Sequence, residues 1–242
     1  MARQIRFSLP HQCKYIVQKG NISTPIFSYN DDFEFYLYNL KELCNRYDCK
    51  IHAYSLLTDQ VHLLITPASS NAISKVMQSL GRTYTKYYNQ YYDRSGTLWD
   101  GRYRASLVSP TEYLLTCMLY IEQSPVRERL VKQAHEYNWS STTHNMGITN
   151  NSFITPHEAY VKLGQSDLKR HEAYRSLIKL PLPGNETTYI LNAINGGWVM
   201  GGHEYSKLIE ELSQRRAQPR NRGGDRRSLC FNNTINKNKD TA

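Results

Sequence analysis

In the first half of the chain, segments with the hydrophobic pattern of β-strands alternate with segments that have the pattern of α-helices. Segments rich in β-forming or alternating residues predict four strands, at residues 11–19, 50–57, 61–66 and 103–108. Segments whose apolar residues recur every three or four positions predict three helices, at residues 33–47, 73–91 and 110–125. The predicted order, with a hairpin in the middle, fits the α+β class: a ferredoxin-like antiparallel sheet with helices on one face.

The hydrophobic pattern weakens after residue 138, where loop-like sequence begins. Shorter helical patterns follow at residues 158–163, 167–180, 187–195 and 204–216, and a glycine-rich link joins the last two. We therefore expect three parts. They are a ferredoxin-like domain at residues 1–135, a helical C-terminal extension at 136–216, and a basic, disordered tail at 217–242.

Charge and composition narrow the class of partner. The chain of 242 residues has 30 Lys and Arg against 21 Asp and Glu, a net charge of +9, which favours nucleic acid or a membrane surface. Its 19 Tyr favour nucleic acid, because aromatic rings interleaved with cations stack unpaired bases. No apolar run reaches the ~18 residues that cross a bilayer, and 5 Cys without Cys-x-x-Cys spacing indicate reduced thiols. We expect a cytoplasmic, nucleoid-associated protein that does not bind membranes.

Two pairs of polar residues each share a face of a predicted element. Gln60 and His62 are two positions apart on a strand, so they project together while the alternate apolar residues face a core. Tyr120 and Ser124 are four positions apart near the end of a helix, so they also share a face. On spacing alone, a strand His and a helix Tyr are more often structural than functional.

Several motifs, in order along the chain, carry a family resemblance. They read Val-His-Leu-Leu-Ile-Thr-Pro at 61–67, Leu-Gly-Arg-Thr-Tyr at 80–84, Ser-Gly-Thr-Leu-Trp-Asp-Gly-Arg at 95–102, Tyr-Ile-Glu-Gln-Ser-Pro-Val-Arg at 120–127 and Tyr-Asn-Trp-Ser-Ser at 137–141. Together they resemble the REP-associated tyrosine transposases, relatives of the single-strand insertion-sequence transposases. The likeness covers nearly the whole chain, and the ordered set is more specific than any one motif.

The resemblance implies a tyrosine nucleophile and a divalent metal on a ferredoxin-like catalytic domain. In this family a tyrosine attacks a phosphodiester of single-stranded DNA, forms a 5′-phosphotyrosine and frees a 3′-hydroxyl. The family's targets are short palindromic hairpins with an unpaired guide sequence beside the stem. On this chain the nucleophile maps to Tyr120. A phenol with a pKa of ~10 is a poor nucleophile at neutral pH, so a nearby cation is needed.

The metal motif of the family is altered in this chain. His62 matches the second His of a His-hydrophobe-His motif, whereas Gln60 stands in place of the first. Ser124 stands where the family commonly has Asn. An amide oxygen binds Mg²⁺ or Mn²⁺, and a hydroxyl does so weakly. The resemblance therefore implies a divalent metal, Mg²⁺ or Mn²⁺, held by His62, Gln60 and Ser124 with reduced affinity.

Two functions fit these features equally. The first is a single-strand endonuclease and strand transferase, and the second is a DNA-hairpin-binding protein whose altered metal site cleaves slowly or not at all. A third, an RNA-binding ferredoxin-like protein, requires aromatic residues on an exposed sheet face, whereas the tyrosines at 84–91 mark the buried face of a helix. The sequence does not decide whether the protein is a monomer or a homodimer.

Basic residues near the motifs and in the tail are candidates for binding DNA phosphates. They are Arg82, Lys86, Arg94, Arg102, Arg104, Arg220, Arg222, Arg226 and Arg227. Arg102 has an alternative role, an ion pair with Asp100 or Glu112. Trp99 is expected to anchor its loop in the core rather than to stack a base.

Overall fold

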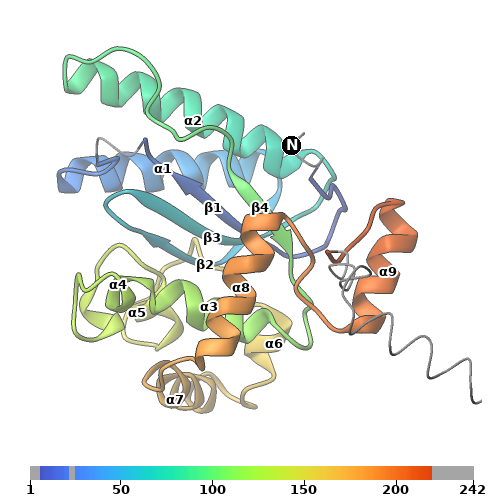
Figure 1. Ribbon diagram of the computed structural model, residues 1–242. Helices are drawn as coiled ribbons and strands as arrows, with labels where there is room; N and C mark the ends of the chain where they lie inside the picture. Colours follow the sequence, from blue (N-terminus) through green and yellow to red (C-terminus); the bar gives the residue numbers. More distant parts are fainter. Residues whose placement is uncertain (1–5, 22–24, 220–242) are drawn as a thin grey trace, which may run out of the picture.

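A four-stranded antiparallel sheet lies at the centre of the residues that the computed structural model describes, 6–21 and 25–219 (Figure 1). Its strands are β1 (Lys14–Lys19), β2 (Cys49–Leu56), β3 (Gln60–Pro67) and β4 (Arg104–Leu107). They lie in the order β2-β3-β1-β4, and every pair of neighbours is antiparallel. This order, with the β2–β3 hairpin at one edge, confirms the predicted ferredoxin-like sheet.

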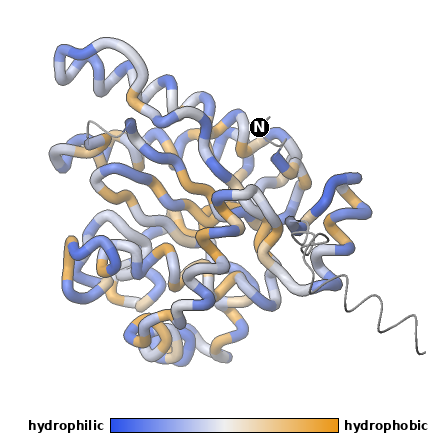
Figure 2. The backbone as a smooth tube through the Cα atoms, in the orientation of Figure 1, coloured by the Kyte–Doolittle hydropathy of each residue, from blue (hydrophilic) through white to orange (hydrophobic). Residues whose placement is uncertain are grey.

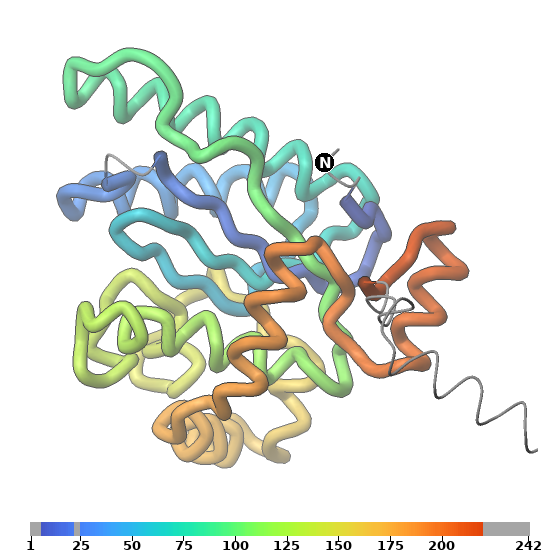
Figure 3. Tube along the Cα trace, viewed as in Figure 1, coloured from blue at the N-terminus to red at the C-terminus, as the bar shows by residue number. Residues whose placement is uncertain are grey.

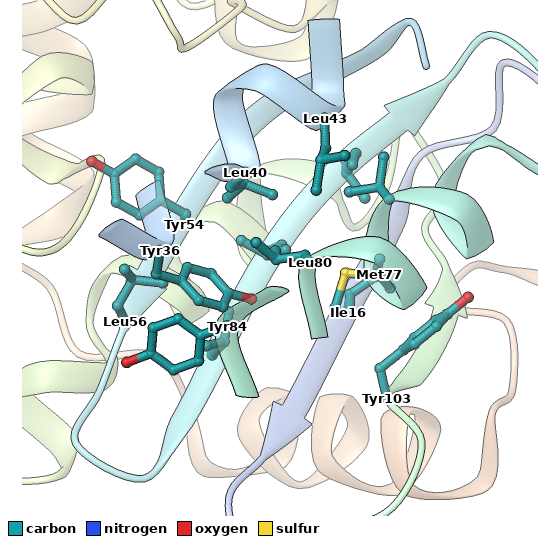
Figure 4. Packing of buried hydrophobic residues seen from close by; sticks show 14 of the residues in the cluster. Ile16, Tyr36, Leu40, Leu43, Tyr54, Leu56, Met77, Leu80, Tyr84 and Tyr103 are labelled. Carbon is teal, nitrogen blue, oxygen red and sulfur yellow. The ribbon is translucent and has the colours of Figure 1, made fainter. Parts of the chain in front are cut away.

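Two helices, α1 (Asn30–Arg46) and α2 (Ala72–Tyr91), cover one face of the sheet (Figure 1). Their apolar sides pack on the predicted inward residues of β3, which are Val61, Leu63 and Ile65. Figure 4 shows this packing, with side chains from both helices in contact with the strands. The face is closed, because the helical and strand periods place apolar side chains on the sides that meet.

The start of α1 is tied to the end of α2 through one carboxylate. Asp32 accepts hydrogen bonds from the backbone N–H groups of Ser28 and Tyr29, at 2.7 and 3.1 Å. These bonds satisfy donors that the first turn of a helix leaves without partners. The phenols of Tyr87 and Tyr92 also donate to Asp32, at 3.2 and 2.7 Å. The carboxylate is therefore a structural cap.

Helices also cover the other face of the sheet, which the prediction of helices on one face did not include. The elements after β4 are α3 (Leu114–Glu122), α4 (Ser124–Arg127), η1 (Ala134–Glu136), α5 (Thr142–Asn145), α6 (Glu158–Val161), α7 (Asp167–Ile178), α8 (Gly184–Gly196) and α9 (His203–Ser213). Side chains from α3, α6, α7 and α8 form one apolar cluster with Tyr15, Val17 and Leu64 of the sheet. The helices of the extension therefore share a core with the sheet. With both faces covered in the part of the chain described, the aromatic surface that an RNA-binding sheet requires is absent.

The chain returns to the sheet edge after α7 (Figure 3). There α8 packs against β4, and the hydroxyl of Ser106 donates to the carbonyl of Ala193 at 3.0 Å. A smaller apolar cluster holds α9 through Ile209, Phe7 and Leu107. Hydrophobic residues concentrate on the strands (Figure 2). No helix among the described residues is long and apolar enough to span a membrane.

The helix that carries Tyr120 ends earlier than predicted. A single helix up to Pro125 was expected, but α3 ends at Glu122 and α4 begins at Ser124. Proline has no N–H to donate to the carbonyl four residues back, which is that of Ile121. The hydroxyl of Ser124 donates to this carbonyl instead, at 2.6 Å. The break redirects the chain just after the tyrosine.

Candidate active site around Tyr120

Tyr120 and His62 lie on the same face of the sheet, and each contacts Tyr15. The rings of Tyr15 and Tyr120 meet edge to face, with centroids 6.0 Å apart. The ring of His62 stacks on Tyr15 at 5.9 Å, and its Nδ1 is 2.6 Å from the Tyr15 hydroxyl. Tyr15 thus joins the two residues that the sequence singled out.

Strand register explains why Tyr15 occupies this place. In the β1–β3 pair Val17 lies opposite His62, and directly opposite residues of an antiparallel pair project to the same face. Tyr15 is two residues from Val17, so it projects to that face as well. All three residues of the cluster are nearly inaccessible, with exposed fractions of 1% for Tyr15, 6% for His62 and 4% for Tyr120.

Arg127 covers the phenol of Tyr120 from the solvent side. Its guanidinium carbon lies 3.8 Å from the centroid of the Tyr120 ring. Burial raises the pKa of Tyr120, while the charge of Arg127 and its hydrogen bond to the phenol act in the opposite direction. A cation therefore already lies beside the group that would have to become a phenolate.

His62 is a neutral imidazole with one nitrogen unused. Burial, aided by the positive charges of Arg127 and Lys19, lowers the pKa of His62 to about 3. Its Nε2 is buried and has no hydrogen-bond partner among the described residues. The hydroxyl of Ser55, directly opposite His62 on β2, is also buried without a partner in that part of the chain. Two such polar atoms at one cross-strand position indicate a place for a polar ligand or an ion.

The predicted metal ligands fit a cation in part. His62 offers a neutral nitrogen while its Nδ1 is held by a hydroxyl, an arrangement typical of metal-binding histidines. Gln60 is buried on the same strand and projects to the same face. Ser124 is less suited, because a neutral hydroxyl is a weak ligand and this one is held against the carbonyl of Ile121. Within residues 6–21 and 25–219, no three His, Cys, Asp or Glu side chains gather into a metal site.

Glu122, which lies between Tyr120 and Ser124 in the chain, is fully buried and links α3 to the extension. Its buried carboxylate accepts hydrogen bonds from Ser141 at 2.5 Å, Asn145 at 2.6 Å and Tyr174 at 2.8 Å. Burial raises the pKa of Glu122 to about 7, against the effect of these three donors. The carboxylate thereby joins α3 to two segments of the extension, α5 with its N-cap and α7.

The candidate DNA-binding residues do not form one group around Tyr120. Arg82 and Lys86 are exposed on α2, which lies across the sheet from α3 (Figure 1). Arg94 lies over the ring of Tyr88, 5.5 Å from its centroid. Proximity in sequence to the motif at 120–127 therefore did not predict proximity in space.

The remaining candidate DNA-binding residues differ in their exposure and in their hydrogen bonds. Arg104 donates a hydrogen bond to the side-chain oxygen of Asn195, which ties β4 to α8. Arg102 is exposed. Trp99 is buried and donates to the carbonyl of Gly81 at 3.3 Å, in agreement with its expected role as a loop anchor. Four tail residues lie outside the described residues: Arg220, Arg222, Arg226 and Arg227.

Sequence reasoning missed two residues of the cluster, Tyr15 and Arg127. Tyr15 carries no local signal, because only the register of β1 against β3 places it beside His62. Arg127 closes the motif that begins at Tyr120, seven residues earlier in the chain. Because α3 ends at Glu122, helical spacing does not place Arg127 over the ring, and its one signal in the sequence is that it belongs to the same motif as Tyr120.

Residues 15–124 match the family model described as IS200-like transposase. Among solved structures, a REP-associated tyrosine transposase bound to a REP hairpin gives a TM-score of 0.51 at 14% identity, covering 64% of this chain and 98% of that one. A putative transposase from Deinococcus radiodurans R1 gives 0.36 at 16%, covering 50% and 97%. No curated protein matches the sequence. The first structural likeness shows a shared fold, and the family match includes Tyr15, His62 and Tyr120 but ends before Arg127.

Proposed function

We propose that this chain, whose residues 15–124 match the IS200-like transposase family model, cleaves and rejoins single-stranded DNA with Tyr120 as the nucleophile. One observation carries the proposal: Tyr120 and His62, far apart in the chain, both contact Tyr15 on one face of the sheet. Arg127 on the phenol supports it, because a cation there favours the phenolate.

The chemical step exchanges one phosphoester for another. The phenol oxygen of Tyr120 loses its proton to solvent and forms a bond to phosphorus. The bond from phosphorus to the 3′ oxygen breaks, and this oxygen takes up a proton to become a free 3′-hydroxyl. The product is a 5′-phosphotyrosine, and attack by a 3′-hydroxyl reverses the step to join strands.

Arg127 has two roles in this proposal. It lowers the cost of forming the phenolate, and its guanidinium offers paired N–H donors to the phosphate that approaches Tyr120. Because the phenol is only 4% exposed, Arg127 must move from the ring as the phosphate enters. The side chain is suited to this movement, since it lies at the surface.

We also propose that His62 and Gln60 bind a divalent metal ion, Mg²⁺ or Mn²⁺. When bound, such an ion polarises the phosphate and stabilises the charge that develops on it. The neutral Nε2 of His62 and the amide oxygen of Gln60 are the atoms we assign to hold it, with Ser124 as a weak third ligand. Tyr15 orients the imidazole through its hydroxyl, 2.6 Å from Nδ1.

The DNA partner we propose is a single strand that folds into a hairpin. The solved relative was bound to a REP hairpin, and the net charge of +9 suits a polyanion. In this proposal residues 1–135 perform the chemistry and residues 136–216 support it through the hydrogen bonds of Glu122. The exposed Arg82 and Lys86 of α2 then serve a hairpin stem on the far side of the sheet.

A covalent adduct tests the proposal directly. Single-stranded hairpin DNA incubated with the full chain and Mn²⁺ should give a protein–DNA band that survives denaturation. Tyr120→Phe should abolish the band, whereas Tyr91→Phe, which removes an exposed hydroxyl on α2, should leave it unchanged. An adduct of equal yield in Tyr120→Phe would refute the assignment of the nucleophile.

A second candidate function is a hairpin-binding protein with an impaired catalytic site. It is favoured by the altered ligand set, in which Gln60 and Ser124 replace the usual His and Asn, and by the bond that holds the Ser124 hydroxyl against the carbonyl of Ile121. If the wild type binds hairpin DNA without an adduct, and the double variant Gln60→His with Ser124→Asn forms one, this second function is the correct one.

A further inference from the structure

A cavity of about 860 Å³ opens beside Arg127. The α3–α4 junction forms one wall, the segment around η1 forms the second, and the segment from α7 to the start of α8 forms the third. This volume is within the range of small-molecule and nucleotide sites. Most of the walls lie beyond residue 124, where the family match ends, so the extension of this chain largely builds the cavity.

The lining combines apolar surface with cations and has no carboxylate. Apolar contacts come from Val126, Ala134, Met146, Ile178 and Leu182, and positive charge comes from Arg127, Lys132, Arg175 and Lys179. The acidic residue of η1, Glu136, accepts hydrogen bonds from the backbone N–H groups of Lys132 and Gln133, at 3.0 and 2.9 Å. Such a lining suits a ligand with a flat apolar part and a negative charge, as a nucleotide has.

Two of the four cations remain available to a ligand. Arg175 is used by the fold, because its Nε donates to the carbonyl of Met146 at 2.7 Å. Arg127 lies on Tyr120. Lys132 and Lys179 are exposed, and neither ammonium group forms an ion pair within residues 6–21 and 25–219. Within the described residues, these two positive charges at the cavity are therefore not neutralised by a carboxylate.

The walls are held at a fixed place relative to Tyr120. Gln123, buried between α3 and α4, donates from its Nε2 to the carbonyls of Ile178 and Leu180, at 3.0 and 2.7 Å. These bonds fix the end of α7 against the junction that follows Tyr120. The side chain of Arg127 lines the cavity and also contacts the ring of Tyr120.

We infer that this cavity binds one unpaired nucleotide of the DNA strand whose phosphate is placed at Tyr120. The inference rests on the proposed function, since that function brings the strand to the phenol. The base lies on the apolar wall of Val126, Ile178 and Leu182, and its phosphate lies between Lys132 and Lys179. Binding of this nucleotide selects which phosphodiester reaches Tyr120.

Binding measurements in the Tyr120→Phe background separate this inference from catalysis. A fluorescein-labelled single-stranded decanucleotide of mixed sequence is the probe, and fluorescence anisotropy at several salt concentrations is the measurement. Removing both lysines, Lys132→Ala with Lys179→Ala, should weaken binding at least tenfold. It should also reduce the slope of log affinity against log salt by about 0.7 for each phosphate that the lysines no longer neutralise. Lys207→Ala on α9 is the matched control and should leave both values unchanged.

Filling the cavity tests the apolar wall without changing charge. Thr187→Trp should weaken binding at least fivefold with an unchanged salt slope, and thermal unfolding checks that the variant is folded. In the wild type, a probe with 5-iododeoxyuridine should cross-link to peptides within residues 123–135 or 175–187. Cross-links confined to other peptides, or lysine variants that match Lys207→Ala, would overturn the inference. A probe that fails to bind the wild type at all would refute the proposed function instead.

Discussion

Two pairs of buried tyrosines, one pair on each face of the sheet, have different partners. On the face covered by α2, Tyr84 donates to the carbonyl of Ile26 at 2.5 Å and Tyr88 to that of Pro25 at 2.7 Å. On the face covered by α3, Tyr15 meets the imidazole of His62 and Tyr120 lies under Arg127. Backbone carbonyls cannot change charge, whereas imidazoles, guanidiniums and phenols respond to protons and phosphates. The first face is therefore a structural core, and the second contains the groups that chemistry requires.

Removing Arg127 should have the largest effect on the α3 face. Loss of one preorganised electrostatic donor typically costs a reaction about 100- to 1,000-fold, so Arg127→Ala should slow adduct formation with hairpin DNA by that factor. The pH optimum should rise, because the cation that favours the phenolate is gone. Lys75→Ala is the matched control, since Lys75 lies 5.7 Å from the centroid of the Tyr47 ring on the other face. Equal rates for the two variants would make the Arg127 contact structural.

Neutralising Glu122 should change how stability depends on pH. Its pKa is raised from 4.5 to about 7, so the folded protein holds a proton that the unfolded chain releases. Stability from this group is complete below pH 4.5 and falls as pH rises to 7, by about 3 kcal/mol at ~1.4 kcal/mol for each unit of pKa. Glu122→Gln should remove this fall, and urea unfolding at pH 5 and pH 8 measures it. Glu172→Gln, on the exposed side of α7, should retain the wild-type difference; a fall of equal size in Glu122→Gln would refute the assignment.

Removing the Tyr15 hydroxyl should reduce activity moderately. A residue that orients a metal-binding histidine typically contributes about 10- to 100-fold to affinity or activity, so Tyr15→Phe should slow adduct formation by at least tenfold. Added Mn²⁺ should restore part of the rate if the imidazole holds the ion. On the other face, Tyr84→Phe should cost about 1 kcal/mol of stability and leave the rate of the folded protein unchanged. Similar rates for both variants would show that Tyr15 only packs.

The smallest effect is expected for Arg104, whose hydrogen bond to Asn195 ties β4 to α8. Arg104→Ala should lower the free energy of unfolding by about 1 kcal/mol, without changing the salt dependence of DNA binding. Arg82→Ala on α2 should leave the free energy of unfolding unchanged and reduce the salt dependence of DNA binding, because the side chain of Arg82 is exposed. A salt slope that falls in Arg104→Ala would return this residue to the DNA-binding set.

Local periodicity by itself determined the elements and the direction of most side chains. Alternation along β3 placed Val61, Leu63 and Ile65 in the core and His62 on the opposite face, as the structure has them. The helical stripe of α2 likewise placed Tyr84 and Tyr88 inside, but the prediction was wrong for Tyr91, which is 56% exposed at the end of the helix. These features depend on backbone geometry within a few residues, which a sequence pattern records directly.

Only the tertiary structure decided which residues surround the phenol. The register of β1 against β3 placed Tyr15 beside His62. The break after Glu122 placed Arg127 over the ring of Tyr120. The second layer of helices, held by Glu122 and Gln123, depends on contacts between segments more than 15 residues apart along the chain. Such contacts result from the packing of whole elements on a sheet. The energy of that packing is distributed over many residues, so no single motif predicts it.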